Sequence, residues 1–129
     1  HIFENIQFPY IPAIYSKSDI LVLPEMGKTV ANAGFPGKTS EYLASGKAII
    51  STDFSNLKDI LKNKENVMMS PLGDLETYTK NLQTLLCDPS LRAKLGVAAL
   101  DTAIQYFDYK NGVMPLVNEL NHFLIKDIV

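Results

Sequence analysis

The residues best suited to chemistry lie in one segment, residues 32–46, with the sequence NAGFPGKTSEYLASG. Gly34, Pro36 and Gly37 would let the backbone approach a ligand closely. The N–H groups of residues 38–40 would then stand unpaired at the start of a helix, where the first amides have no partner within the helix. Because such a helix start favours anions, the segment predicts an anion-binding turn.

Polar side chains at this predicted helix start extend the argument. Lys38 would place a positive charge beside the free amides, and Thr39 and Ser40 would add hydroxyls, a set that suits a diphosphate. Glu41 is either a ligand for the two hydroxyls of a ribose or a solvated charge that interacts with the helix dipole by about 0.3–1 kcal/mol. A glycine-rich turn with a capping hydroxyl also explains the segment, since the phosphate-loop pattern is absent. Spacing alone leaves these interpretations open.

The remaining residues indicate no other chemistry. His1 and His122 are isolated from Cys87 and from any paired carboxylates at ligand spacing, so we expect no metal site. A Ser/His/Asp nucleophile set is not visible either. Capping is a sufficient explanation for the aspartates at turns and helix starts, which are Asp53, Asp59, Asp74 and Asp88. The catalytic residues are therefore left unassigned.

The elements that must position the segment alternate between apolar runs and helical patterns. Residues 19–23 (DILVL) form a continuous run ended by proline, as expected of a strand buried on both faces. Shorter runs predict strands at residues 48–51 and 67–70, and residues 2–3 fit the end of a fourth strand. The helices predicted between them lie at residues 12–18, at residues 39–45, followed by Gly46, and at residues 57–62.

This alternating order predicts the fold class. Short links between strands and helices favour a parallel sheet with right-handed crossovers and helices on both faces, a three-layer α/β/α arrangement. Ligands of such sheets bind at the carboxyl ends of the strands. The glycine-rich turn of residues 32–46 follows a strand and opens a helix, so it is expected at that edge.

The C-terminal half is predicted to be helical, with helices at residues 75–87, at residues 89–107 and from about residue 114 onward. Asp74 and Asp88 are expected to cap the first two helices. Pro115 delays the third, because proline is tolerated only in the first turn of a helix. Their apolar stripes, together with Tyr106 and Phe107, are expected to join the core.

Length and composition limit the class of protein. The chain has 129 residues, of which 47% are hydrophobic and 20% charged, the balance of one soluble globular domain. A formal net charge of −2 gives no reason to bind nucleic acid. The single cysteine, Cys87, has leucine neighbours, so we expect a buried free thiol and a reducing, cytoplasmic setting. The sequence contains no run suited to cross a bilayer and no signal segment, and its start at His1 indicates part of a longer protein.

Four blocks of the sequence resemble a known family. They are IPAIYSKSDILVLP, GFPGKTSEYLASGKAIIST, ENVMMSPLGD and DPSLRAKLG, in that order. Their order and spacing are similar to those in the carboxyl-terminal domain of retaining glycosyltransferases of family four, and the resemblance covers residues 11–109. The most specific matches are Pro36, Lys38, Glu41, Tyr42 and Gly46.

The resemblance implies a fold and a set of site residues. Family members have two Rossmann-like domains in a GT-B fold, and the carboxyl-terminal one binds a nucleotide diphosphate sugar in the cleft between them. Of the two glutamates in the family motif, Glu41 matches the one that holds the ribose, whereas the sugar-contacting one falls on Ala33, with Asn32 beside it as a possible substitute. The nucleotide-sugar-binding residues implied here are Asn32, Gly34, Phe35, Pro36, Gly37, Lys38, Thr39 and Glu41.

The resemblance also implies an activity for the intact protein. We expect transfer of a sugar from a nucleotide diphosphate donor to a glycan or lipid-linked acceptor, with retention and without a metal cofactor. Residues 1–129 would be a partial donor-binding domain that lacks the amino-terminal acceptor domain and the first strand-helix unit, so the fragment alone should be inactive. Any membrane contact, at the inner surface, would come through the missing part. A nucleotide-sugar 2-epimerase of the same fold and a non-catalytic nucleotide-binding or interaction domain are the alternatives.

Overall fold

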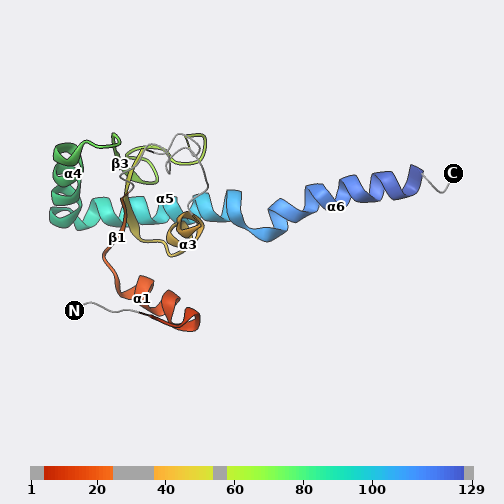
Figure 1. The fold of residues 1–129 in the computed structure, drawn as a ribbon, viewed down its shortest axis with the longest axis horizontal. Helices are drawn as coiled ribbons and strands as arrows, with labels where there is room; N and C mark the ends of the chain where they lie inside the picture. Colours follow the sequence, from red (N-terminus) through yellow and green to blue (C-terminus); the bar gives the residue numbers. More distant parts are fainter. Residues whose placement is uncertain (1–4, 25–36, 54–57, 127–129) are drawn as a thin grey trace.

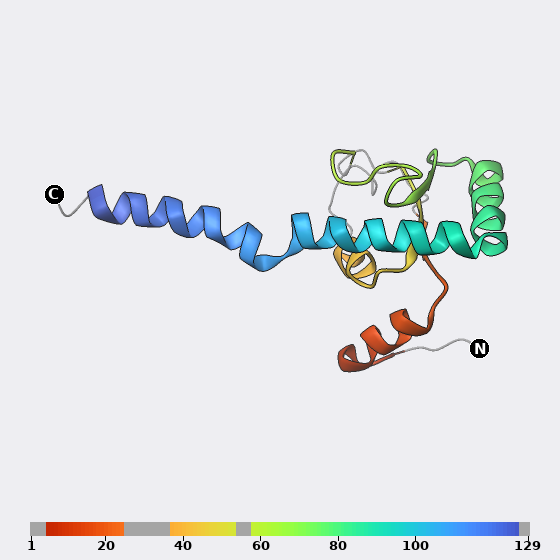
Figure 2. The ribbon, with the colours of Figure 1, turned by 180° about the vertical axis from the view of Figure 1, so that it is seen from behind.

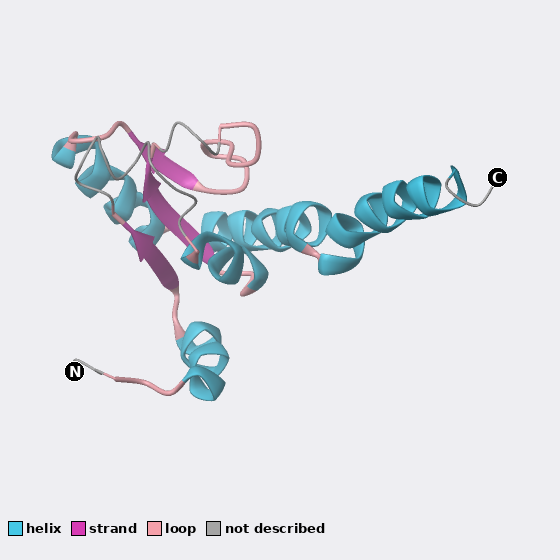
Figure 3. Cartoon of the chain, turned by 45° about the vertical axis from the view of Figure 1, so that its right-hand side comes forward, coloured by secondary structure: helices cyan, strands magenta, loops and turns pink. Residues whose placement is uncertain are grey.

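The computed structural model of the chain describes residues 5–24, 37–53 and 58–126. Its strands are β1 (Ile20–Leu23), β2 (Ala48–Thr52) and β3 (Met68–Ser70). Its helices are the short 3-10 helix η1 (Phe8–Tyr10), α1 (Ile11–Lys17), α3 (Lys38–Ala44), α4 (Leu75–Cys87), α5 (Pro89–Phe107) and α6 (Tyr109–Lys126). Figure 1 shows their arrangement, and Figure 3 shows the strands with helices to either side.

The strands form a parallel sheet in the order β1-β2-β3. Ile20 pairs with Ala48 at the start of the first ladder, and Ile50 pairs with Met68 at the start of the second. Every pairing among the described strands is parallel, so each crossover must return the chain to the amino edge of the sheet. The predicted parallel sheet and the strands predicted at residues 19–23, 48–51 and 67–70 are confirmed, whereas the strand end predicted at residues 2–3 lies outside the described residues.

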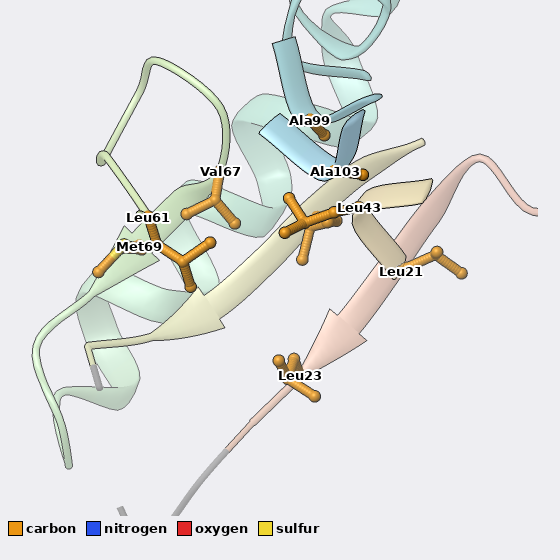
Figure 4. Close-up of a cluster of buried hydrophobic side chains, with 9 residues drawn as sticks. Leu21, Leu23, Leu43, Leu61, Val67, Met69, Ala99 and Ala103 are labelled. Atoms are coloured by element: carbon orange, nitrogen blue, oxygen red, sulfur yellow. The ribbon is translucent and has the colours of Figure 1, made fainter. Parts of the chain in front are cut away.

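Two hydrophobic clusters cover the two faces of the sheet. Since side chains alternate along a strand, β1 and β2 contribute to both. The first cluster comprises Leu21, Leu23, Leu43, Ile49, Leu61, Val67, Met69, Ala99 and Ala103. Figure 4 shows this cluster in close-up. The second comprises Ala48, Ile50, Met68, Leu85 and Leu95. Helix α3 thus packs on one face, α4 packs on the other, and α5 supplies side chains to both.

The close packing of α3 against α5 depends on two glycines. Gly46 follows α3 with a φ of +66°, the left-handed conformation typical of a glycine after a helix, which confirms its predicted role. Gly96, within α5, faces it so closely that a Cβ atom at residue 96 would collide with the carbonyl oxygen of Gly46. The two backbones therefore touch without an intervening side chain.

The prediction of a helix at residues 57–62 is wrong for residues 58–62, the part that the structure describes, because the chain forms turns there. The side chain of Asn66 pairs the backbone of these turns. Its Oδ1 accepts a hydrogen bond from the Lys62 amide at 2.8 Å, and its Nδ2 donates to the Ile60 carbonyl at 2.8 Å and to Thr102 Oγ1 at 2.9 Å. A buried side chain from a later turn thus takes the place of helical hydrogen bonds.

The helix caps agree with the sequence, and some burial predictions do not. Asp74 and Asp88 cap α4 and α5 as predicted, each with a carboxylate that accepts a backbone N–H. β1 is an edge strand of the described sheet and leaves Val22 43% exposed, so the prediction of burial on both faces is wrong. Cys87 is an exposed free thiol, not a buried one. Leu86 beside it is also exposed, because it lies on the outer side of α4.

Helix α6 begins at Tyr109, before the predicted start near Met114. Asp108 explains the earlier start, since its Oδ1 accepts the Lys110 amide at 2.9 Å and its carbonyl accepts the next two amides. Pro115 therefore lies inside the helix, where proline removes one hydrogen bond.

The side chains of α6 do not join the core as predicted. Figures 1 and 2 show α6 extending away from the sheet and from the other helices of the chain. Its apolar residues over the part with described side chains are exposed, namely Tyr109, Val113, Met114, Leu116, Val117, Leu120 and Phe123. The apolar stripe is present, but the described chain does not cover it.

Candidate functional site

The predicted site residues fall into two groups. Asn32, Gly34, Phe35 and Pro36 lie outside the described residues, so the structure tests no prediction made for them. Gly37, Lys38, Thr39 and Glu41 lie together at the first turn of α3. Because α3 runs from one parallel strand to the next, its start lies toward the carboxyl edge of the sheet, where ligands of such folds bind.

The amino end of α3 has no side-chain cap among the described residues. Gly37 is the N-cap residue and makes no side-chain cap hydrogen bond, so the first amides of the helix receive none from that position. Lys38 and Glu41 are exposed in the same turn. Thr39 is buried instead, and its Oγ1 has no hydrogen-bond partner among the described residues. Its side chain therefore lies on the inner side of the turn, away from the solvent-exposed Lys38 and Glu41.

Glu41 is held by a residue that the sequence argument did not select. Tyr15 of α1 donates a hydrogen bond from its hydroxyl to Glu41 Oε2 at 3.0 Å. The ring of Tyr15 meets the ring of Tyr42 edge-on, with centroids 5.2 Å apart and an angle of 80° between the ring planes. Burial, the hydrogen bond to Glu41 and the charge of that carboxylate raise the pKa of Tyr15 to about 12. Helices α1 and α3 are thus joined at the first turn of the predicted site.

A cavity of about 380 Å³ adjoins this contact. It lies between η1 and α1 on one side and α3 on the other. Its lining residues are Phe8, Ile11, Pro12, Tyr15, Ser16, Glu41, Ala44 and Ser45. Most of these side chains are apolar, and Glu41 is the charged one among them. The sequence did not indicate the cavity, because residues 17–40 of the chain separate the lining residues of its two walls.

The carboxyl ends of β2 and β3 form a polar edge. Asp53, directly after β2, donates its amide to the Ser70 carbonyl at 2.8 Å, and its Oδ2 lies 3.7 Å from Lys58 Nζ. Its Oδ1 is buried and has no hydrogen-bond partner within the described part of the chain. Ser51 is buried and donates to the Thr52 carbonyl. The edge predicted to face a ligand is therefore built of polar groups next to an apolar sheet.

Over residues 5–24, 37–53 and 58–126, the structure has no cluster of three or more histidine, cysteine and acidic side chains able to hold a metal ion. Within the same ranges, no helix is both long enough and apolar enough to span a membrane.

The parallel sheet and the helices on its two faces define an α/β domain of the Rossmann-like class. The chain belongs to the family described as glycosyl transferases group 1, whose sequence profile matches residues 2–88. The resemblance noted in the sequence is thus confirmed at the level of this family. No curated protein sequence matches the chain.

Two solved structures share the fold. The C-terminal domain of a glycosyl transferase group 1 family protein (LpcC) from Francisella tularensis has a TM-score of 0.67 at 23% identity, over 83% of this chain and 52% of that one. Sucrose-phosphate synthase from Thermosynechococcus elongatus has a TM-score of 0.76 at 19% identity, over 98% of this chain and 30% of that one. The predicted fold, that of the C-terminal domain of a GT-B glycosyltransferase, is confirmed. The chain spans about half of the first structure and less of the second.

Proposed function

We propose that the protein containing this chain transfers a sugar from a nucleotide diphosphate donor to a glycan or lipid-linked acceptor. In this proposal the domain binds the donor, and the reaction retains the configuration at the anomeric carbon, as in the family-four enzymes that the sequence resembles. The observation that carries the proposal is the first turn of α3, where Lys38 and Glu41 are exposed beside a helix start that has no side-chain cap.

The proposed roles follow from the chemistry of the donor. Negative charge builds on the diphosphate as the glycosidic bond breaks, and fixed amides with an adjacent cation stabilise that charge. The amides at the start of α3 and the Lys38 ammonium would supply this stabilisation without a metal ion. The Glu41 carboxylate would accept hydrogen bonds from the ribose hydroxyls. The acceptor site and the remaining donor contacts would come from the rest of the protein.

Glu41→Ala and Lys38→Ala in the full-length protein test these roles. We expect each variant to raise the donor KM. Glu41→Ala would do so by removing the contact with the ribose. Lys38→Ala would also lower kcat, because the leaving diphosphate would lose a stabilising cation. A lost hydrogen bond to a charged group costs about 1.5–3 kcal/mol, which corresponds to a change of roughly 10- to 150-fold.

Two variants serve as matched controls. Glu76→Ala removes an exposed glutamate from the first turn of α4, and Lys80→Ala removes an exposed lysine from the same helix. Both should leave donor kinetics unchanged. If the Glu41 and Lys38 variants matched these controls in KM and kcat, the donor site would have to lie elsewhere.

Ala33 favours a second candidate, a non-catalytic nucleotide-binding domain. This residue stands where the family motif has its sugar-contacting glutamate. The full-length protein should be assayed with nucleotide-sugar donors, both with acceptors and alone. Sugar transfer would exclude the non-catalytic candidate, and epimer formation from the donor alone would identify a 2-epimerase instead.

A further inference from the structure

We propose that Tyr15 is a positioning residue for Glu41: its hydroxyl holds one carboxylate oxygen, so that the other is presented to the ribose of a nucleotide. The inference rests on the proposed function, which assigns Glu41 to the ribose. It adds a residue on a different helix, 26 positions away, which is not among the nucleotide-sugar-binding residues named from the sequence.

The contact joins two helices that lie on either side of β1 in the chain. Tyr15 belongs to α1, before the first strand, and Glu41 belongs to α3, after it. The Tyr15 hydroxyl lies 3.0 Å from Glu41 Oε2, which is hydrogen-bond distance. The contact lies at the wall of the 380 Å³ cavity between these helices, which both residues line.

The tyrosine is itself anchored, as a positioning residue must be. Its ring packs edge-on against Tyr42, and both rings are partly buried against the hydrophobic cluster on that face of the sheet. Edge-to-face packing fixes the ring plane, and with it the direction of the hydroxyl. A rigid donor therefore points at one oxygen of a side chain that is otherwise exposed.

Ordering Glu41 before a ligand arrives would strengthen binding. A free glutamate samples many rotamers and loses that freedom when it is fixed by a ligand. A residue already held in its bound conformation avoids most of this loss. Because Tyr15 engages Oε2, the second oxygen, Oε1, keeps both of its acceptor positions for the ribose hydroxyls.

The contact also persists over the physiological pH range. The pKa of Tyr15 is about 12, raised by burial of the hydroxyl and by the Glu41 carboxylate. The phenol therefore keeps its proton and remains a donor. Its effect on nucleotide binding should not change between about pH 6 and 9.

Tyr15→Phe in the full-length protein is the test, because it removes the hydroxyl and keeps the ring. The probes are UDP, GDP and ADP, and the 2′,3′-dideoxy analogue of whichever binds best, with Kd measured by calorimetry. We expect Tyr15→Phe to weaken the ribonucleotide roughly five- to tenfold, as for loss of one charge-assisted hydrogen bond that orders a side chain. The dideoxy analogue should be weakened less than about twofold, since it has no ribose hydroxyl for Glu41 to hold. Tyr109→Phe, at an exposed tyrosine of α6, is the matched control and should change neither Kd.

The design separates positioning from a purely structural role. Loss of packing in Tyr15→Phe would weaken both nucleotides equally, which would overturn the inference, as would an unchanged Kd. In a Glu41→Ala background, Tyr15→Phe should have no further effect; an effect of the same size would also overturn it. If Glu41→Ala leaves the ribonucleotide Kd unchanged, the ribose assignment itself fails. If that variant weakens binding and Tyr15→Phe does not, only the present inference fails.

Discussion

At the start of α4, one aspartate pairs the groups that the first turn of a helix leaves open. Asp74 Oδ1 accepts the Thr77 amide at 2.9 Å, and Oδ2 accepts the Thr77 hydroxyl at 2.7 Å. The hydrogen bond from the Thr77 hydroxyl is the main cause that holds the pKa of Asp74 below its ordinary value of 3.8, and the hydrogen bond from the Thr77 amide adds to it. The charged carboxylate is therefore the form that stabilises the helix.

The pH dependence of this cap can be predicted from the direction of the shift. A pKa lower in the folded than in the unfolded state means that the cap stabilises the fold above about pH 4, and that this contribution is lost as the pH falls through the folded-state pKa. Asp74→Ala should therefore lower the free energy of unfolding at neutral pH, and its difference from the wild type should shrink below about pH 4. Urea unfolding at several pH values measures this difference.

The control for this prediction is Asp101→Ala, which removes an exposed carboxylate from within α5 and leaves the cap in place. If the Asp74→Ala difference stayed constant down to about pH 3, it would have to come from interactions other than the charge of the cap.

Residue-scale features differ in how far the sequence predicts them. The Asp74 and Asp88 caps were predictable, because a cap depends on residues within a few positions of each other. The pairing of Tyr15 with Glu41 was not, because it requires the packing of two helices whose contact no local pattern specifies. The missed cavity has the same cause, since Tyr15 and Glu41 lie on its opposite walls.

At the scale of elements, the contact between α3 and α5 is set by the absence of a side chain. A Cβ atom at residue 96 would meet the Gly46 carbonyl, which belongs to backbone and cannot move aside as a flexible side chain could. Gly96→Ala should therefore destabilise the chain by about 1–3 kcal/mol, the usual cost of overpacking, although alanine is the better helix former. Thermal and urea unfolding measure the change.

Gly112→Ala is the matched control for this prediction. Gly112 lies within α6, and a Cβ atom there would meet nothing within 4 Å. This substitution should stabilise the chain slightly or leave it unchanged, by up to about 1 kcal/mol. Equal effects at residues 96 and 112 would show that helix propensity, not the contact with Gly46, determines both.

Helices and strands were predictable where the residues that determine them are close in sequence, and not where residues distant in sequence determine them. The apolar run of β1 and the glycine after α3 gave the correct strand and the correct helix end. The helix predicted at residues 57–62 was wrong because Asn66, a later residue, satisfies the backbone of these turns. The start of α6 was wrong because the hydrogen bonds to Asp108 outweigh the cost of Pro115 inside the helix.

At the scale of the whole molecule, α6 stands apart from the two hydrophobic clusters. None of its described side chains is buried, so it adds little apolar burial to the fold. A chain that ends at Asp108 should therefore have a free energy of unfolding within about 0.5 kcal/mol of that of the 129-residue chain, as expected for changes away from the core. Differential scanning calorimetry of the two chains compares them.

A control for the truncation removes one buried side chain instead of a helix. Leu95→Ala in α5 should cost about 2–5 kcal/mol, because Leu95 is fully buried in the second cluster. A loss of similar size on removal of residues 109–129 would mean that α6 covers apolar surface of the domain in solution.

The sequence identified the apolar stripe of α6 but not its exposure. A helical pattern shows which face of a helix is apolar, while what covers that face depends on the packing of the complete molecule. The same distinction applies to Val22, whose strand lies at the edge of the described sheet.

The double role of α5 has a consequence for how this domain is made. A ribosome releases the strands first, and α5, which supplies Leu95 to one cluster and Ala99 and Ala103 to the other, emerges later. The second cluster cannot close until Leu95 has left the exit tunnel, and the first cannot close until Ala103 has left it. The apolar strands of the nascent chain therefore stay uncovered until most of the last third of the chain has been synthesised. During this interval chaperones can bind them.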